Sequence, residues 1–251
     1  MDDKIQKFRQ LLEKSNNIIF FGGAGVSTES GIPDFRSKDG LYNQKYDYPP
    51  EEILSHSFFI NNTSEFYKFY KDKMNSLNYK PNITHMKLVD LENTSKLKGI
   101  ITQNIDGLHQ KAGSKNVYEL HGSVLRNYCM KCGKFYNADY VFNSNGIPLC
   151  SCGGIIKPDV VLYDENLDSN ILKNSILAIQ NADLLIVAGT SLTVYPASGL
   201  INYFNGNNLV LLNRDSTPYD YMADLVINES LGEVFEKIWL KDNIVLKMSN
   251  A

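Results

Sequence analysis

The sequence has no apolar run that approaches the roughly 20 residues a helix needs to cross a bilayer. Met1-Asp2-Asp3-Lys4 is not followed by an apolar stretch of signal-peptide length either. Basic residues are not in excess, since the formal net charge is −3 and the isoelectric point is about 5.8. A chain with this charge has no general electrostatic attraction to nucleic acid. We therefore expect a cytoplasmic protein with no membrane partner and no direct nucleic-acid partner.

Cysteine is also scarce, and the four cysteines form two close pairs, Cys129-x-x-Cys132 and Cys150-x-Cys152. In a reducing compartment such a cluster indicates a metal more often than disulfides. Four thiolates at about 2.3 Å from Zn²⁺ close a tetrahedral structural site. The second pair is tight, but Gly153-Gly154 can relieve its turn. We predict a zinc ribbon, and four unligated buried cysteines are the alternative.

The most informative stretch is a glycine-rich turn that follows an apolar run at 18–21. Gly23 and Gly25 allow backbone amides to approach a phosphate, and Ser27 and Thr28 could open a helix whose N-terminus favours an anion. The pattern departs from the dinucleotide fingerprint, because Thr28 stands at the third glycine position and no second strand ending in an acid follows. It therefore predicts a nucleotide phosphate site but argues against a hydride-transfer dehydrogenase. An ordinary α/β turn is the alternative.

Hydrophobic periodicity predicts the remaining elements. Helices are expected at 3–14, 82–94, 168–180 and 231–240, with two or three short ones in 50–77 that form an insertion. Strands are expected at 18–21, 99–102, 117–120, 155–162, 183–188, 209–212 and 224–227. Internal repeats and low-complexity linkers are absent, and 251 residues suffice for one large domain, or for one domain plus an insertion.

Most of the predicted strands end in small or polar residues. Apolar strands that alternate with helices predict a parallel sheet buried on both faces, and the carboxyl ends of such strands form one edge where ligands bind. The fold class is therefore α/β. The residues predicted to meet at this edge are Gly23, Gln103, Asn104, His121, Gly189, Thr190, Ser191 and Asn213.

One histidine at this edge can do acid–base chemistry. His121 stands at a strand end before a glycine, and an imidazole there can act as a general base near neutral pH. Asn104 and Asp106 offer an amide and a carboxylate for a ribose hydroxyl or a carboxamide. His56, His85 and His109 are expected to be structural, and His121 itself stays open between a catalytic and a structural role on spacing alone.

These segments, in this order, are similar to those of sirtuins, which are NAD-dependent protein-lysine deacylases. The resemblance covers about residues 15–240 and is closest to bacterial sirtuins. It is carried by Gly-Ala-Gly-Val-Ser (23–27), Gly-Ile-Pro-Asp-Phe-Arg (31–36), Thr-Gln-Asn-Ile-Asp (102–106), Glu-Leu-His-Gly (119–122), the four cysteines, Gly-Thr-Ser-Leu (189–192) and Asn213-Arg214.

The resemblance implies a Rossmann-like domain and a smaller domain with the cleft between them. The large domain would comprise 1–36, 80–123 and 158–251. The small domain would combine a helical insertion, 37–79, with a zinc ribbon, 124–157.

The resemblance also implies the site residues. Zinc would be held by Cys129, Cys132, Cys150 and Cys152. NAD would be held by Ala24, Gly25, Thr28, Phe35, Arg36, Gln103, Asn104, Ile105, Asp106, His121, Gly189, Thr190, Ser191, Asn213, Arg214 and, less closely matched, Leu231.

The implied reaction transfers the acetyl group from a lysine of a protein substrate to ADP-ribose and releases nicotinamide. His121 would be the general base, and Asn104 would position the ribose and a water molecule. A mono-ADP-ribosyltransferase and a non-catalytic NAD-binding sensor are the alternatives on the same scaffold. Retention of His121 and Asn104 favours catalysis over sensing.

Two positions depart from patterns within this family. Sirtuins usually have Phe-Gly-Glu where the substrate backbone pairs, whereas this chain has Tyr163-Asp164-Glu165. Desuccinylating members carry Tyr-x-x-Arg in the helical insertion, whereas this chain has Tyr67-Lys68-Phe69-Tyr70. We therefore expect an altered peptide preference and a neutral acyl group.

Overall fold

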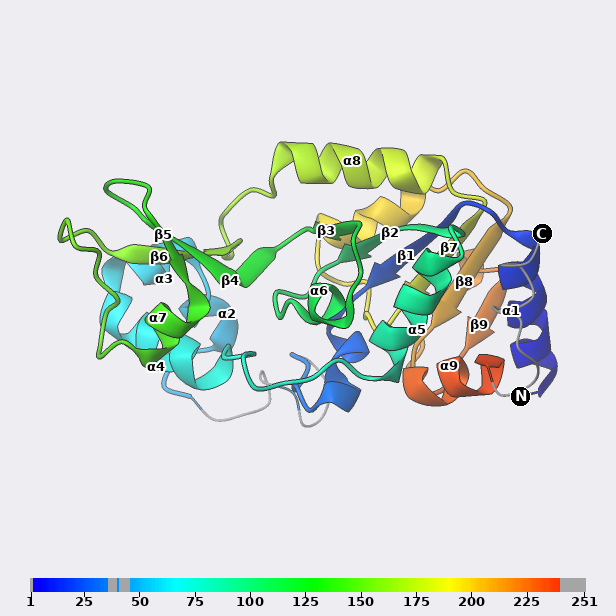
Figure 1. The fold of residues 1–251 in the computed structure, drawn as a ribbon, viewed down its shortest axis with the longest axis horizontal. Coiled ribbons are helices and arrows are strands. Elements are labelled where there is room, and N and C mark those ends of the chain that lie inside the picture. The colour runs from blue at the N-terminus through cyan, green and yellow to red at the C-terminus, as the bar shows by residue number, and fades with distance from the viewer. Residues whose placement is uncertain (1, 36–39, 41–45, 240–251) are drawn as a thin grey trace.

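The computed structural model describes residues 2–35, 40 and 46–239. Figure 1 shows two groups of elements along the long axis of the molecule, a six-stranded sheet with its helices and a smaller group built on a three-stranded sheet. Within the described residues, no helix is long and apolar enough to cross a membrane.

The large sheet is parallel throughout and has the strand order β3-β2-β1-β7-β8-β9. This is the order typical of a dinucleotide-binding Rossmann sheet. Its strands run without polar alternation because both faces are covered. Their bounds are β1 Ile18–Gly22, β2 Leu97–Thr102, β3 Val117–Glu119, β7 Leu184–Ala188, β8 Asn208–Leu212 and β9 Leu225–Ile227.

Alternate residues of each strand face opposite sides, so each strand contributes to two cores. In β1, Ile18 and Phe20 pack with the helices on one face, whereas Ile19 and Phe21 belong to the core on the other face. The first face is covered by α1 Asp2–Lys14, α5 Ile83–Asn93 and α9 Leu231–Trp239, the second by α8 Ser169–Gln180 and the 3₁₀ helix η4 Ala197–Tyr203 (Figure 1). The helices predicted from periodicity at these places are confirmed.

A buried histidine pair joins α5 to the short helix α6 Leu108–Ala112. The ring centroids of His85 and His109 lie 4.8 Å apart, and both side chains are buried. His85 Nδ1 accepts the Asn82 N–H at 3.3 Å and completes a capping box. Neither ring nitrogen of His109 has a hydrogen-bond partner among the described residues. Burial lowers the pKa of His85 to about 4, and burial followed by the charge of His85 lowers that of His109. The predicted structural role of both agrees with this packing.

This pair should make the fold sensitive to acid. Because the folded-state pKa of His85 lies below the ordinary 6.5, the unfolded chain binds more protons between those values. The stabilisation is complete above pH 6.5 and is lost as the pH falls towards 4. We expect His85 to contribute about 2 kcal/mol to the loss of unfolding free energy between pH 7 and pH 5. Urea unfolding at pH 7 and at pH 5 measures this loss of unfolding free energy. His85→Gln should reduce the difference, and equal pH slopes for His85→Gln and the parent would contradict the assignment.

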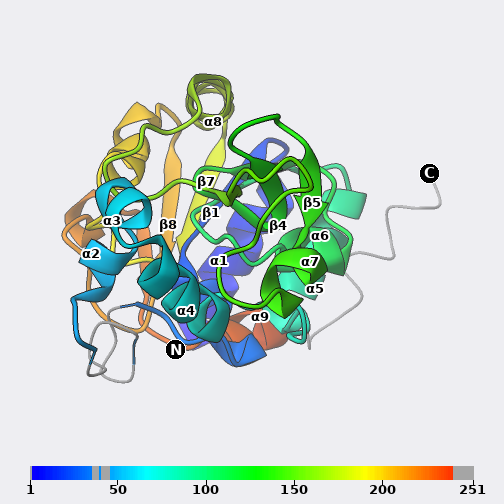
Figure 2. The ribbon, with the colours of Figure 1, turned by 90° about the vertical axis from the view of Figure 1, so that its left-hand side faces the viewer.

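The smaller group combines three helices with an antiparallel sheet of order β5-β4-β6. Its elements are α2 Pro50–Ile53, α3 His56–Asn61, α4 Thr63–Lys73, β4 Gly122–Cys129, β5 Phe135–Asn137, α7 Ala138–Asn143 and β6 Ile156–Val160. They share one core, in which Phe66 and Tyr67 of α4 pack with Val124 and Ile156 of the sheet. Figure 2 shows this group in front of the large sheet.

Two features of this group qualify the sequence interpretation. The strand predicted at 155–162 pairs antiparallel with β4 and does not join the large sheet. In addition, β4 and β6 run across the expected domain boundaries at 123/124 and 157/158. The division into domains therefore stays a prediction.

The helix expected after the glycine turn is not formed. The chain makes two 3₁₀ turns instead, η1 Ala24–Val26 and η2 Thr28–Ser30, and Gly31 ends the second at φ +92°. Three-residue turns have no sum of aligned peptide dipoles like that of a longer helix. The expected anion site at a helix N-terminus is therefore wrong for this loop, and the loop must bind through individual amides and side chains.

Candidate active site

The carboxyl ends of β1, β2, β7 and β8 open on one cavity of about 810 Å³. It lies where the strand order changes direction between β1 and β7, the usual ligand position in an open α/β sheet. Every described residue of the predicted cofactor set lines this cavity, whereas Arg36 lies outside the described residues. The lining members of the set are Ala24, Gly25, Thr28, Phe35, Gln103, Asn104, Ile105, Asp106, His121, Gly189, Thr190, Ser191, Asn213, Arg214 and Leu231.

The glycines of this edge are needed for close backbone packing. A Cβ atom on Gly25 would lie 2.8 Å from the Gly189 Cα, and one on Gly23 would lie 2.6 Å from the Thr190 Cβ. Gly25 N–H donates to the Gly189 carbonyl at 2.8 Å, and Gly189 itself has φ +59°. The sequence interpretation assigned these glycines to ligand approach. The structure adds that they let the β1 and β7 turns touch.

His121 is oriented by a single backbone contact. Its Nδ1 lies 2.9 Å from the Gln103 carbonyl oxygen, which can only accept a hydrogen bond. Nδ1 therefore carries the proton of the neutral ring, and the lone pair is on Nε2. Burial lowers the pKa of His121, although the bond to Gln103 opposes this shift. The base form thus predominates at neutral pH, as a general base requires.

Asn104 is held by a short hydrogen-bond chain. Its Nδ2 donates to Ser27 Oγ at 3.1 Å, and Ser27 Oγ donates to Asp106 Oδ2 at 2.6 Å. The other carboxylate oxygen of Asp106 accepts the Leu108 N–H at 2.8 Å. Burial raises the pKa of Asp106, and the bonds from Ser27 and Leu108 oppose that rise. Because the amide nitrogen is engaged, the carbonyl oxygen of Asn104 is left to accept from a ligand.

The supporting roles of two side chains near this cluster were not predicted, since Ser27 was considered only as a helix start and Ser76 was not considered. Ser27 lies within the glycine motif, so its position was a usable signal for a supporting role. Ser76 Oγ donates to the Asp106 carbonyl at 3.0 Å, and no local pattern marks it. Gln103 links β2 to β7 by donating from Nε2 to Thr190 Oγ1 at 3.1 Å.

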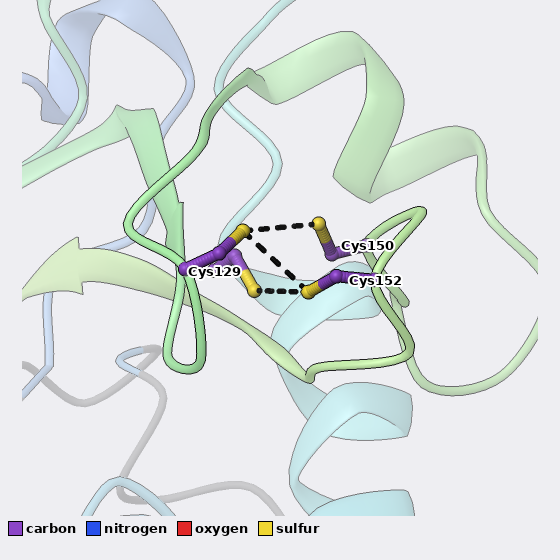
Figure 3. Close-up of side chains that lie close together, drawn as sticks. Cys129, Cys150 and Cys152 are labelled. Carbon is purple, nitrogen blue, oxygen red and sulfur yellow. Dashed lines mark hydrogen bonds between the residues drawn. The ribbon is translucent and has the colours of Figure 1, made fainter.

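The four cysteines of the predicted metal centre lie together in a cluster that could hold a metal ion. Their sulfur atoms lie within 4.8 Å of one another and converge from the two turns, as Figure 3 shows for the labelled three. The Cys129–Cys152 and Cys132–Cys150 sulfur distances are 3.5 and 3.6 Å. Four sulfurs at the corners of a zinc-centred tetrahedron would lie about 3.8 Å apart, so the set fits Zn²⁺.

The tight second pair is accommodated by glycine, as the sequence interpretation anticipated. Gly153 has φ +78°, and a Cβ on Gly154 would lie 2.7 Å from the Cys129 sulfur. With four protein ligands the site is closed, which is typical of structural zinc.

The opposite wall of the cavity comes from the smaller group, with Leu54, Tyr70, Met74 and the segment that follows β6. Asp164 lies in this segment with φ +73°. That left-handed region favours glycine, although aspartate is among the residues that tolerate it. Its side chain accepts a hydrogen bond from Ser57 at 3.3 Å. The backbone conformation would therefore also suit glycine, the residue that the Phe-Gly-Glu pattern has at this position.

Asp164 should disfavour acidic substrate peptides, because like charges repel at the expected pairing segment. We expect the parent to prefer acetyl-lysine peptides flanked by Lys over those flanked by Glu by about threefold, and Asp164→Gly to reduce that preference. Comparison of kcat/KM for the two peptides measures it. Asp164→Gly should melt no lower than the parent, because the left-handed backbone suits glycine. An unchanged peptide ratio would show that Asp164 has no such role.

Comparison with known proteins gives a consistent picture. Residues 23–196 match the Sir2 family. An NAD-dependent protein deacetylase of Clostridium perfringens is 60% identical over 95% of this chain and 99% of its own length. One of Cutibacterium acnes is 50% identical over 90% and 94%.

The fold is similar to solved structures as well. A Sir2 complex with p53 peptide and NAD⁺ has a TM-score of 0.84 at 40% identity and covers 93% of this chain and 96% of its own. A Sir2 structure with deacetylated p53 peptide and 3′-O-acetyl-ADP-ribose has a TM-score of 0.87 at 39% identity, with the same coverage.

Proposed function

The chain belongs to the Sir2 family, and from this premise we propose which of its residues carry out the reaction. The protein is an NAD-dependent protein deacetylase that acts on acetylated lysine and releases nicotinamide. The assignment of roles rests on one observation. His121, Asn104 and the glycine turns after β1 and β7 all line the same cavity.

The residues present fit NAD. The glycine turns pack against each other without intervening side chains and line the cavity, and Leu231 adds an apolar surface there. We assign the nicotinamide and its ribose to Gln103, Asn104, Ile105 and Asp106. The loop residues Ala24, Gly25, Thr28, Phe35 and Arg36 would cover the cofactor. We assign the adenosine half of NAD to Gly189, Thr190, Ser191, Asn213, Arg214 and Leu231. When bound, NAD supplies a ribose carbon that loses nicotinamide and a hydroxyl that accepts the acetyl group.

His121 takes a proton at Nε2 from a ribose hydroxyl, which makes that oxygen nucleophilic towards the activated acyl group. The Gln103 carbonyl then stabilises the imidazolium, since it accepts the Nδ1 proton in both charge states. Asn104 presents its carbonyl oxygen to the ribose and to water, because Ser27 and Asp106 fix its amide. Phe35 lines the cavity and excludes water from the reacting carbon.

A nicotinamide-release assay with and without an acetyl-lysine peptide tests the function. The deacetylase releases nicotinamide and free lysine together, and only when the peptide is present. Release with ADP-ribose attached to protein would indicate a mono-ADP-ribosyltransferase. No release in the presence of bound NAD would indicate a sensor.

The acyl group is expected to be neutral. Tyr70 stands where desuccinylating members carry arginine, and it is stacked between Phe66 and Phe142 at 5.5 and 5.6 Å. Burial, then the nearby Tyr67, raises its pKa well above the ordinary value, so it stays a neutral phenol. Lys71 is bound to Ser144 and Gly146. A buried succinyl carboxylate would thus be poorly compensated.

We therefore expect kcat/KM for an acetyl-lysine peptide to exceed that for the succinyl peptide by about tenfold or more. Tyr70→Arg should gain succinyl activity. Lys73 also lines the cavity but is paired with Asp72 at 2.9 Å, so Lys73→Gln is the matched control. A preference for succinyl in the parent would overturn this prediction.

We also propose the domain division and the location. The large domain would comprise 1–36, 80–123 and 158–251, and the small domain 37–79 and 124–157. A cytoplasmic location is supported by the four cysteines, which form no disulfide and make a set suited to zinc in a reducing compartment.

A further inference from the structure

The wall of the cavity that we assign to NAD is built from segments that are distant in the chain. Thr28 and Glu29 belong to η2, the second turn after β1, whereas Leu231 is the first residue of α9. All three residues line the cavity. The shape of this wall therefore depends on what joins η2 to α9.

One side chain makes that junction. Glu29 Oε1 accepts the Gly232 N–H at 3.0 Å, across 203 residues of sequence. Gly232 is the second residue of α9, so its amide is one of the donors that the helix itself leaves unpaired. A carboxylate is also the side chain that the positive end of a helix favours. Glu29 thus closes the first turn of α9 together with Ser230, whose Oγ accepts the Glu233 N–H at 3.4 Å.

The glycine at position 232 allows the carboxylate to come this close. A Cβ atom on Gly232 would lie 2.8 Å from the Glu29 Cδ and nearer still to its Oε2. The carboxylate is the end of a flexible side chain, so an alanine at 232 would displace the carboxylate rather than the helix. The contact can therefore be broken from either side, at Glu29 or at Gly232.

The first turn of the same loop, η1, is held independently of this contact. It is fixed by its bond to the Gly189 turn and by Asn82, whose Nδ2 donates to the Val26 carbonyl at 2.8 Å. The Thr28 hydroxyl bonds within the loop, to the carbonyl of residue 25 at 3.0 Å, and does not reach α9. Loss of the Glu29 carboxylate would therefore release the end of the loop that carries Thr28 and leave η1 in place.

We propose that Glu29 is a positioning residue for NAD, which holds η2 against α9 so that Thr28 and Leu231 are in place before the cofactor binds. A wall that is ordered in advance costs less free energy to organise on binding. Glu29 acts through the backbone of Gly232 and takes no part in the acyl transfer. This inference rests on the proposed function of the site, because it takes Thr28 and Leu231 as contacts of NAD.

Calorimetric binding of NAD and steady-state kinetics test the proposal. In Glu29→Ala, we expect the Kd for NAD to rise about three- to tenfold, the scale of one hydrogen bond. The kcat at saturating NAD and the Kd for an acetyl-lysine peptide should match the parent, because the segment expected to pair with the peptide, 163–165, lies on the opposite wall. Glu29→Gln keeps an acceptor oxygen and should bind NAD within about twofold of the parent.

The variant Gly232→Ala separates positioning from general damage. Alanine is the better helix former, so this variant should melt close to the parent although one hydrogen bond is lost. Its Kd for NAD should nevertheless rise as in Glu29→Ala. The double variant should bind NAD no more weakly than either single variant, because both remove the same contact. The matched control is Glu233→Gln, which changes a carboxylate of the same helix that pairs with Lys237 at 3.9 Å and should keep the parent's Kd for NAD.

Several outcomes overturn the role of Glu29. They are an unchanged Kd for NAD in Glu29→Ala or in Gly232→Ala, additive effects in the double variant, a Glu29→Gln protein as weak as Glu29→Ala, and a loss confined to kcat. Nicotinamide release by the parent with the same peptide reports the deacetylase function separately. A parent that binds NAD but releases no nicotinamide refutes the proposed function, and the NAD affinities of the variants still decide the role of Glu29.

Discussion

Replacement of His121 by alanine is expected to lower deacetylation by about 10²–10⁴-fold, the usual scale for loss of a general base. The reason is geometric, since the Gln103 carbonyl fixes the proton on Nδ1 and leaves the lone pair on Nε2. NAD should still bind, because the other residues of the cavity are untouched. Steady-state kcat/KM and the Kd for NAD are the two measurements.

The pH profile gives a second readout of the same assignment. Because burial lowers the pKa of His121, the acidic limb of kcat/KM should lie below the ordinary histidine value near 6.5. In His121→Ala that limb should disappear, and added imidazole should restore part of the rate. The matched control is His56→Gln, which changes a histidine outside the reacting cluster and should keep full turnover at saturating peptide. Near-full activity in His121→Ala would refute the assignment.

The second large effect is expected on removal of the metal centre. Cys129→Ala should lose zinc, because three thiolates no longer close the tetrahedron. Metal binding is linked to folding, so the ribbon should lose its order and the protein its stability. Cys129 and Cys150 also belong to the core shared with α3 and α4, so the damage should reach the helical insertion. We expect a loss of at least about 3 kcal/mol, or about 10 °C in melting temperature.

Zinc content and melting temperature measure this effect. Ser151→Ala is the matched control, since it lies between two ligands and contributes no thiolate. It should keep the metal and the parent's melting temperature. A zinc-free Cys129→Ala protein that melts with the parent would contradict a structural role.

Much of the fold could be predicted because its signals are local. The apolar runs of β1, β7 and β8 are continuous, which marks strands buried on both faces. The helix predicted at 82–94 begins as expected, and Asn82 caps α5 together with His85. The metal centre was predicted from the spacing of the two cysteine pairs alone. Each of these features is decided within a few residues, where propensity and side-chain periodicity act.

Other features could not be read in this way because they depend on which elements meet. The strand at 155–162 has the same apolar character as the others, yet it pairs with β4 because the chain has already left the large sheet. The loop after β1 carries good capping residues, but contact with the Gly189 turn and the early Gly31 limit it to 3₁₀ turns. Here tertiary packing overrode local preference.

The sequence by itself therefore determined most of the strands and the pairing of the cysteines, because periodicity and spacing suffice for these, whereas His121 as the base is a prediction from the resemblance to sirtuins. Only the tertiary structure decided how these groups work. The tautomer of His121 depends on a carbonyl 18 residues away, and the orientation of Asn104 depends on Ser27, 77 residues away. The pKa of Glu165 is lowered against its burial by bonds from Leu162, His56 and Lys157, of which His56 is 109 residues away. Hydrogen bonds and burial act through space, so their effects on protons and amides exist only once the chain has brought distant residues together.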